Sequence, residues 1–194
     1  MKSSLVIAAA YLLLWSSGAD ASPYAGVDLN SDLLNLNSAD SSLFPQSMVG
    51  PDFHVGYRFD GLNLAAELGY GTGRGKQDPD ILRLNRLSAD GLYYVPVGGF
   101  LSLVLSAGGA EVNYGDSTAT FIVNQTNGVT KTFRQGNTVF HGDEFDWRAG
   151  AGLSFALTDS YEIHFLTRYQ PVSMKGLADY SLSLDFGMNF YFDL

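Results

Sequence analysis

Apolar and polar residues alternate strictly at the carboxyl-terminal end of the chain. Every even position from Tyr180 to Leu194 is aliphatic, aromatic or methionine, and nearly all the odd positions between them are polar or glycine. A period of two residues is typical of a β-strand with one apolar and one polar face. The length of this segment suits a tilted strand that crosses a membrane better than a strand of a soluble sheet.

Seven further segments show the same alternation, four of them clearly and three more weakly. The clear ones are 52–59, 62–71, 145–157 and 161–169, and the weaker ones are 24–30, 84–95 and 100–112. Short turns are expected at 60–61, 96–99 and 158–160, and long loops at 31–47, 72–83, 113–144 and 170–179. Eight strands joined alternately by short turns and long loops predict a closed up-and-down barrel, because an open sheet edge is costly in hydrocarbon.

The distribution of charge decides which face of these strands lies inside. A soluble barrel buries its apolar face, whereas here the apolar faces carry rings and the polar faces carry ionisable groups. Such an arrangement predicts an all-β, eight-stranded, antiparallel up-and-down transmembrane β-barrel with a charged lumen. The polar lumen network is predicted to contain His54, Arg58, Glu67, Asp90, Arg148, Glu162, His164, Arg168 and Asp185.

Turn lengths predict how the lumen residues pair. A two-residue turn at 60–61 places His54 opposite Glu67, and a three-residue turn at 158–160 places Gly150 opposite Arg168. Small residues opposite long ones suit an eight-stranded lumen, which is just wide enough to be filled by side chains. We expect three arginines, Arg58, Arg148 and Arg168, to neutralise the lumen carboxylates in one network that fills the barrel. The alternative interpretation is that the lumen is a narrow conduit for ions or small solutes rather than a filled interior.

The amino terminus has the pattern of a secretory signal peptide. Lys2 precedes an apolar run at 5–15, and Ala19-Asp20-Ala21 has the small residues of a cleavage site. The expected division is therefore a signal peptide at 1–21 and an outer-membrane β-barrel domain at 22–194.

The chain has 11 basic and 20 acidic residues, a net charge of -9, which argues against nucleic-acid binding. Cysteine is absent, which excludes disulfides and thiolate chemistry.

The sequence contains no arrangement that predicts catalysis, a cofactor or a metal site. Strand 161–169 offers His164-Phe165-Leu166, which lacks the His-x-Ser pattern of the barrel deacylases that modify lipid A. His141, Asp143 and Glu144 form a cluster of the kind that is usually solvated. His54 and His164 are interpreted as hydrogen-bond partners in the lumen. A lipid-modifying enzyme therefore ranks third, behind a non-enzymatic structural barrel and a narrow channel.

Several segments resemble the small eight-stranded outer-membrane barrels, namely the transmembrane domain of OmpA, the opacity proteins and the OmpX and Ail-type barrels. They are 24–29, 55–59, 66–70, 147–152 and the aromatic final strand. The resemblance implies a monomer in the bacterial outer membrane that contacts lipid and lipopolysaccharide. It also implies recognition of the final strand by the barrel assembly machinery. The chain departs from the pattern at Leu194, where a phenylalanine is usual, and lacks the peptidoglycan-binding domain of full-length OmpA.

The third long loop predicts a hairpin, because Asn127-Gly128 lies between two β-branched runs. We expect it to extend the fifth and sixth strands outward and to present Phe121, Val123 and Phe133 as a surface contact. The first loop, at 31–47, is also apolar for a surface segment. The predicted function is a non-enzymatic outer-membrane barrel, structural in the membrane and adhesive or protective through its loops, with host or matrix surfaces as partners. The alternative is a porin-like channel for ions or small solutes.

Overall fold

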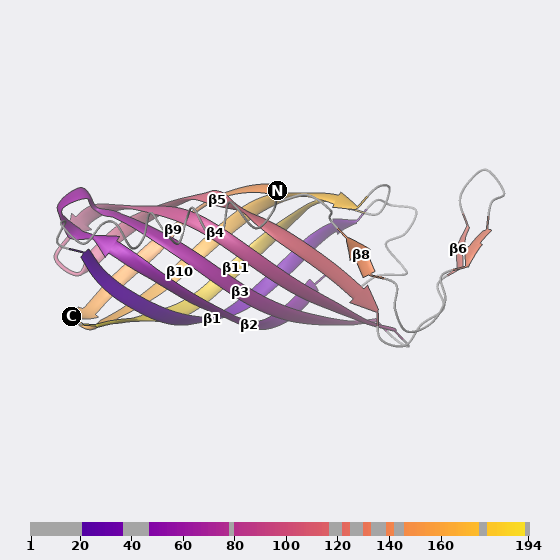
Figure 1. Cartoon of the computed structure of the whole chain (residues 1–194), viewed down its shortest axis with the longest axis horizontal. Helices are drawn as coiled ribbons and strands as arrows, with labels where there is room; N and C mark the ends of the chain where they lie inside the picture. The colour runs from indigo at the N-terminus through magenta and orange to yellow at the C-terminus, as the bar shows by residue number, and fades with distance from the viewer. Residues whose placement is uncertain are drawn as a thin grey trace.

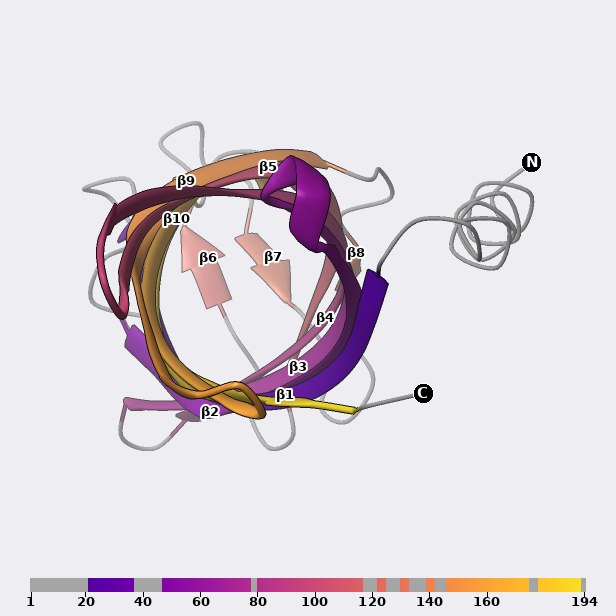
Figure 2. The same ribbon diagram turned by 90° about the vertical axis from the view of Figure 1, so that its left-hand side faces the viewer.

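The part of the chain that the computed structural model describes forms a closed barrel of eight long strands (Figures 1 and 2). It comprises residues 21–36, 47–77, 80–116, 122–124, 130–132, 139–141, 146–174 and 178–192. The long strands are β1 (Ala21–Leu36), β2 (Ser47–Phe59), β3 (Leu64–Gln77), β4 (Asp80–Gly98), β5 (Leu101–Asp116), β9 (Asp146–Thr158), β10 (Tyr161–Met174) and β11 (Ala178–Tyr191). The predicted fold class is confirmed.

Each long strand pairs in antiparallel fashion with its neighbours in the chain, and the first strand pairs with the last. The β1–β11 ladder runs from Tyr24 opposite Tyr191 to Leu36 opposite Ala178. All other consecutive long strands are paired as well, including β4 with β5 and β5 with β9. In the end-on view the strands form a ring (Figure 2). The sheet therefore has no unpaired edge along its long strands, as a β-sheet in hydrocarbon requires.

The short turns lie together at one end of the barrel, at the left in Figure 1. The β2–β3 turn is longer than predicted, because the 3₁₀ turn η1 (Asp60–Leu62) is followed by Asn63 with a φ of 53°. His54 consequently pairs with Gly69 and Gly56 with Glu67, so the predicted pairing of His54 with Glu67 is wrong by two residues. An even shift leaves every side chain on its predicted face. The predicted pairing of Gly150 with Arg168 is confirmed.

The strands continue further into the predicted loops than the apolar alternation indicated. β1 extends to Leu36, so Leu33 and Leu34 belong to a barrel strand rather than to an apolar surface loop, and Leu34 is buried. β4 likewise extends to Gly98, which moves its turn to Gly99 and Phe100. The backbone hydrogen bonds between neighbouring strands do not depend on an apolar outer face. The strands can therefore extend beyond the residues in which apolar and polar positions alternate.

The third long loop contains three short strands: β6 (Ile122–Asn124), β7 (Thr130–Thr132) and β8 (Val139–His141). β6 and β7 pair around the predicted Asn-Gly position, with Val123 opposite Lys131, which confirms a hairpin. It is a two-stranded sheet of its own, so the expectation that it continues the long strands is wrong; β8 is the strand that pairs with β5. Phe121, Phe133 and the predicted signal peptide up to residue 20 lie outside the described residues, and only the backbone of Val123 is described.

The outer face of the barrel is apolar and rich in rings. Its exposed side chains include Phe53, Val55, Tyr70, Leu105, Trp147, Phe165 and Phe186. Neighbouring strands stack these rings: the Phe165 and Phe186 centroids are 4.6 Å apart, and Tyr169 contacts both Trp147 and Tyr180. A soluble monomer rarely exposes so much continuous apolar surface. The described residues contain no helix long and apolar enough to cross a membrane.

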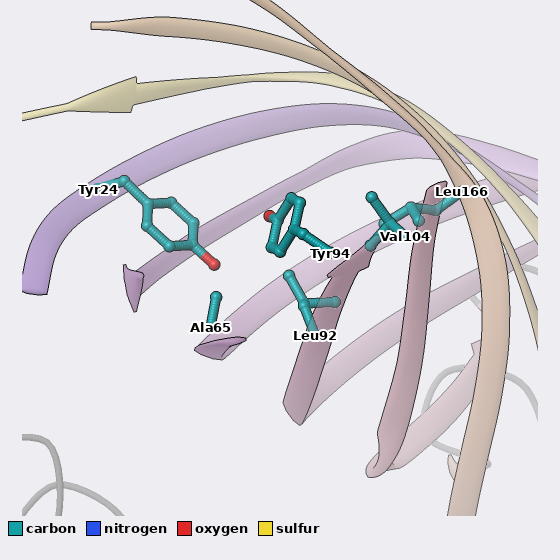
Figure 3. Close-up of a cluster of buried hydrophobic side chains, with 6 residues drawn as sticks. All are labelled: Tyr24, Ala65, Leu92, Tyr94, Val104 and Leu166. Carbon is teal, nitrogen blue, oxygen red and sulfur yellow. The ribbon is translucent and has the colours of Figure 1, made fainter. Parts of the chain in front are cut away.

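A small apolar cluster lies inside the barrel (Figure 3). It consists of Tyr24, Ala65, Leu92, Tyr94, Val104 and Leu166, all buried. Leu166 breaks the polar pattern of its strand at the sequence level, and this cluster accounts for the break because the residue faces inward beside Val104. The lumen therefore holds apolar side chains as well as ion pairs, and Leu34, Met48 and Leu84 are buried outside this cluster.

Gly56 leaves space for this cluster, and its replacement is expected to be destabilising. A Cβ atom there would lie 2.5 Å from Cζ of Tyr24 and 2.6 Å from the backbone oxygen of Ala66. We expect Gly56→Ala to lower the free energy of unfolding by about 1–3 kcal/mol, because overpacking displaces the ring and the strand. Urea unfolding followed by the emission of Trp147 measures it. Gly61→Ala is the control, since nothing lies within 4 Å of its Cβ position; equal midpoints for the two variants would contradict the prediction.

Candidate functional site

The candidate site is the polar lumen, and the structure places all nine of the predicted lumen residues on the inner face of the barrel. Eight of them are buried, and the side chain of Arg58 is 21% exposed. Glycines on the facing strands make room for these long side chains. Gly56 lies opposite Glu67, Gly150 opposite Arg168 and Gly187 opposite His164. The alternation of small and large residues therefore explains how a narrow lumen holds this many charges.

At the end with the short turns, Arg58 joins a carboxylate to aromatic rings. Its Nη1 donates to Oε2 of Glu162 at 2.7 Å and to the Tyr191 hydroxyl at 3.2 Å. The guanidinium lies over the Tyr94 ring, 4.1 Å from the centroid. The Tyr24 hydroxyl donates to Glu67 at 3.2 Å. Glu162 thus neutralises Arg58, and a cation–π contact with Tyr94 helps to hold the guanidinium at this end of the lumen.

Two further arginines pair with carboxylates deeper in the barrel. Arg168 contacts Asp185 directly and lies 3.5 Å from Oε1 of Glu67. Arg148 binds Asp90 with two donors, of which Nε lies 2.8 Å from Oδ1. Each of these side chains is at least nine-tenths buried. Buried charges are tolerated only when paired in this way, because transfer of an isolated ion from water is very costly.

A fourth arginine pair escaped the sequence analysis. Arg86 donates to Asp32 at 3.0 Å and also contacts Asp52. Asp32 lies in a segment that was predicted to be a loop, and Arg86 lies in one of the weaker strands. The signal that could have found Asp32 is the inward series Asp28, Asn30 and Asp32, which keeps the period of two beyond the predicted strand end.

Asp28 is a further residue that the sequence analysis missed, and it lies between two predicted ones. Its Oδ1 is 2.9 Å from Nε2 of His164, and its Oδ2 is 3.6 Å from Nδ1 of His54. The two imidazole centroids are 5.7 Å apart. The structure therefore brings two histidines from β2 and β10 to one carboxylate on β1, a set of groups that can bind a proton or a cation.

No family model and no curated protein matches this chain. Among solved structures, Neisserial surface protein A superposes with a TM-score of 0.61 at 15% identity, over 89% of this chain and 97% of that protein. The chain has the fold of an outer-membrane β-barrel. Ail, the attachment invasion locus protein of Yersinia pestis, in complex with the heparin analogue sucrose octasulfate, gives a TM-score of 0.52 at 12% identity, over 89% and 97%.

A third outer-membrane barrel of this fold is the outer membrane protein OprG from Pseudomonas aeruginosa. It has a TM-score of 0.51 at 10% identity and covers 91% of this chain and 97% of OprG. The three barrels are thus matched over nearly their whole length at very low identity. Their shared property is the eight-stranded barrel.

Proposed function

We propose that the chain is a non-enzymatic protein of the bacterial outer membrane, structural in the bilayer and adhesive or protective through its long loops. The observation that carries this proposal is the inversion of the barrel, with rings outside and ion pairs inside. Lipid is the environment that favours such an outer face. Phospholipid and lipopolysaccharide are then its immediate partners, with insertion as a monomer by the barrel assembly machinery through the final strand.

Membrane fractionation of expressing cells tests this location. We expect the protein in the outer-membrane fraction, with an electrophoretic mobility that changes on boiling because a closed barrel resists detergent until heated. Recovery in the periplasmic or cytoplasmic fraction of a protein whose mobility does not change would contradict the proposal. The same mobility change tests whether each variant is folded.

The filled lumen supports a scaffold rather than a conduit. Arg58, Arg86, Arg148 and Arg168 all extend into the lumen and are paired there. Tyr24 and Tyr94 close one layer of it. A porin-like channel is the alternative that the polar lining supports, and single-channel recording on the purified protein separates the two. Stable conductance steps would favour the channel.

A barrel in the outer membrane presents the connections opposite its short turns to the surroundings of the cell, and the segment between β5 and β9 is the longest of them. Ail, the attachment invasion locus protein, is in complex with the heparin analogue sucrose octasulfate in its structure. The net charge of -9 in this chain disfavours such a polyanionic ligand. We therefore propose host-cell or matrix proteins as the partners of the loops, with the β6–β7 hairpin and the predicted contact residues Phe121, Val123 and Phe133 as the first segment to test.

Removal of residues 118–135 is expected to abolish binding of expressing cells to matrix-coated surfaces. The deletion takes away the β6–β7 hairpin but none of the eight long strands, so the barrel should still fold. Adhesion per cell is the measurement, with equal surface expression verified by antibody against an unrelated loop tag. Binding that persists in the deletion variant, or that is absent from cells expressing the intact protein, would contradict a role for this hairpin in adhesion.

A further inference from the structure

Asp28, His54 and His164 converge inside the barrel from three different strands. One ligand atom from each residue lies within 4.8 Å of the other two. Gly187 on β11 pairs with Asp28 on one side and with His164 on the other, so no side chain from the intervening strand separates them. All three are buried. At the sequence level the two histidines were interpreted as hydrogen-bond partners rather than ligands, and Asp28 was not among the predicted lumen residues.

The hydrogen bonds of His54 determine which of its ring nitrogens carries the proton. Nε2 lies 2.6 Å from Oδ1 of Asn189, an acceptor, and the amide nitrogen of Asn189 donates to Glu162 at 3.2 Å, which fixes the amide orientation. Nε2 of the neutral ring is therefore the donor, and Nδ1 carries a lone pair. That lone pair faces Oδ2 of Asp28 at 3.6 Å. Two acceptors that face each other in a buried site favour a cation between them, either a proton on Nδ1 or a metal ion.

His164 approaches the same carboxylate from the opposite side. Its Nε2 lies 2.9 Å from Oδ1 of Asp28, while its Nδ1 has no hydrogen-bond partner in the described part of the chain. The ring is held through Nε2, the atom that would bind a cation shared with Asp28. Metal-binding histidines are commonly oriented through their second nitrogen, as Asn189 orients His54.

The charge inside the barrel points in the same direction. The ion pairs described for the lumen join seven carboxylates to four guanidiniums and two imidazoles. Six of the carboxylates lie against an arginine: Asp32, Asp52, Glu67, Asp90, Glu162 and Asp185. The ion pairs of Asp28 are with the histidines. With neutral imidazoles, these seven carboxylates exceed the four guanidiniums by three negative charges, and a divalent cation would offset two of them.

We propose that Asp28, His54 and His164 bind a divalent transition-metal ion inside the barrel. Two imidazoles and one carboxylate form a donor set that Zn²⁺ uses with a fourth, open position. Tetrahedral ligands at about 2.0–2.1 Å from an ion lie roughly 3.4 Å apart, so the site needs to contract by about 1.4 Å at most. Binding replaces the proton on Nε2 of His164, which is released. The ion would link β1, β2 and β10 across the lumen.

Zinc binding by the folded protein tests the proposal. The protein is folded in detergent, exposed to Zn²⁺, dialysed and assayed for metal content and for affinity by competition with a chelating dye. We expect one Zn²⁺ per chain, and an affinity lowered by more than about 100-fold in His54→Ala and in His164→Ala. The matched control is His141→Ala, because His141 is the third histidine of the chain. Its variant should retain full affinity.

Two outcomes would overturn the proposal. One is a wild-type protein that retains no zinc after dialysis. The other is zinc that is lost in His141→Ala and kept in His54→Ala, which would place the metal in the loop that also holds Asp143 and Glu144. The mobility change on boiling verifies that each variant is folded. Asp28→Asn preserves the shape of the side chain and tests the carboxylate ligand. Co²⁺ in place of Zn²⁺ reports tetrahedral binding through its visible absorption.

Discussion

Replacing Arg168 by alanine is expected to lower the free energy of unfolding by about 3–5 kcal/mol, because it leaves buried carboxylates without their cation. Asp185 loses its direct partner, and Glu67 loses the guanidinium 3.5 Å away. Arg168 itself is 3% exposed, so water cannot replace it without opening the barrel. Equilibrium unfolding in urea from detergent or lipid vesicles, followed by the emission of Trp147 on the outer face, measures the loss.

Arg83→Ala is the control for this prediction. Arg83 lies exposed on β4, three residues from the buried Arg86, so removal of its charge should change the unfolding free energy by less than about 0.5 kcal/mol. Equal, small effects for Arg83→Ala and Arg168→Ala would show that the lumen carboxylates do not depend on Arg168. In that case the network would be held together mainly by hydrogen bonds to the tyrosines and asparagines.

The second large effect is expected at the bidentate pair of Arg148 and Asp90. Each single replacement, Arg148→Met or Asp90→Leu, should cost about 3–5 kcal/mol, because either one leaves the opposite charge buried and unpaired. The double variant should be more stable than the less stable single variant, since it removes both charges and substitutes apolar groups. The four unfolding free energies form a double-mutant cycle. Strictly additive losses would refute the idea that these two residues neutralise each other.

Much of the barrel could be predicted from alternation alone, and the reason is geometric. A β-strand sends successive side chains to opposite faces, so the pattern around His54, Glu67 and Arg168 already assigned each of them to the lumen. The error in the β2–β3 register did not change this, because the longer turn with Asn63 in the left-handed region shifts the pairing by two residues. A shift of one residue would have inverted a whole strand.

The pairing inside the lumen was harder to predict. Asp32 and Arg86 meet across the barrel from β1 and β4, which are not neighbours, so no hairpin arithmetic connects them. Asp28 and His164 are likewise separated by β11. Contacts across a closed barrel depend on its diameter and on the stagger of its strands, which are properties of the whole sheet. Alternation within one strand contains no information about them.

The pairing of β1 with β11 also constrains how the barrel can assemble. The first and last strands of the described chain pair from Tyr24 opposite Tyr191 to Leu36 opposite Ala178, and the amide of Phe192 donates to the carbonyl of Pro23 beyond that ladder. Closure therefore requires segments separated by almost the entire sequence to meet, which is the slowest kind of contact to form. Until they meet, two strands have open edges that hydrocarbon does not tolerate. Insertion and closure should thus occur together, in a single cooperative step that begins only after the final strand has been synthesised.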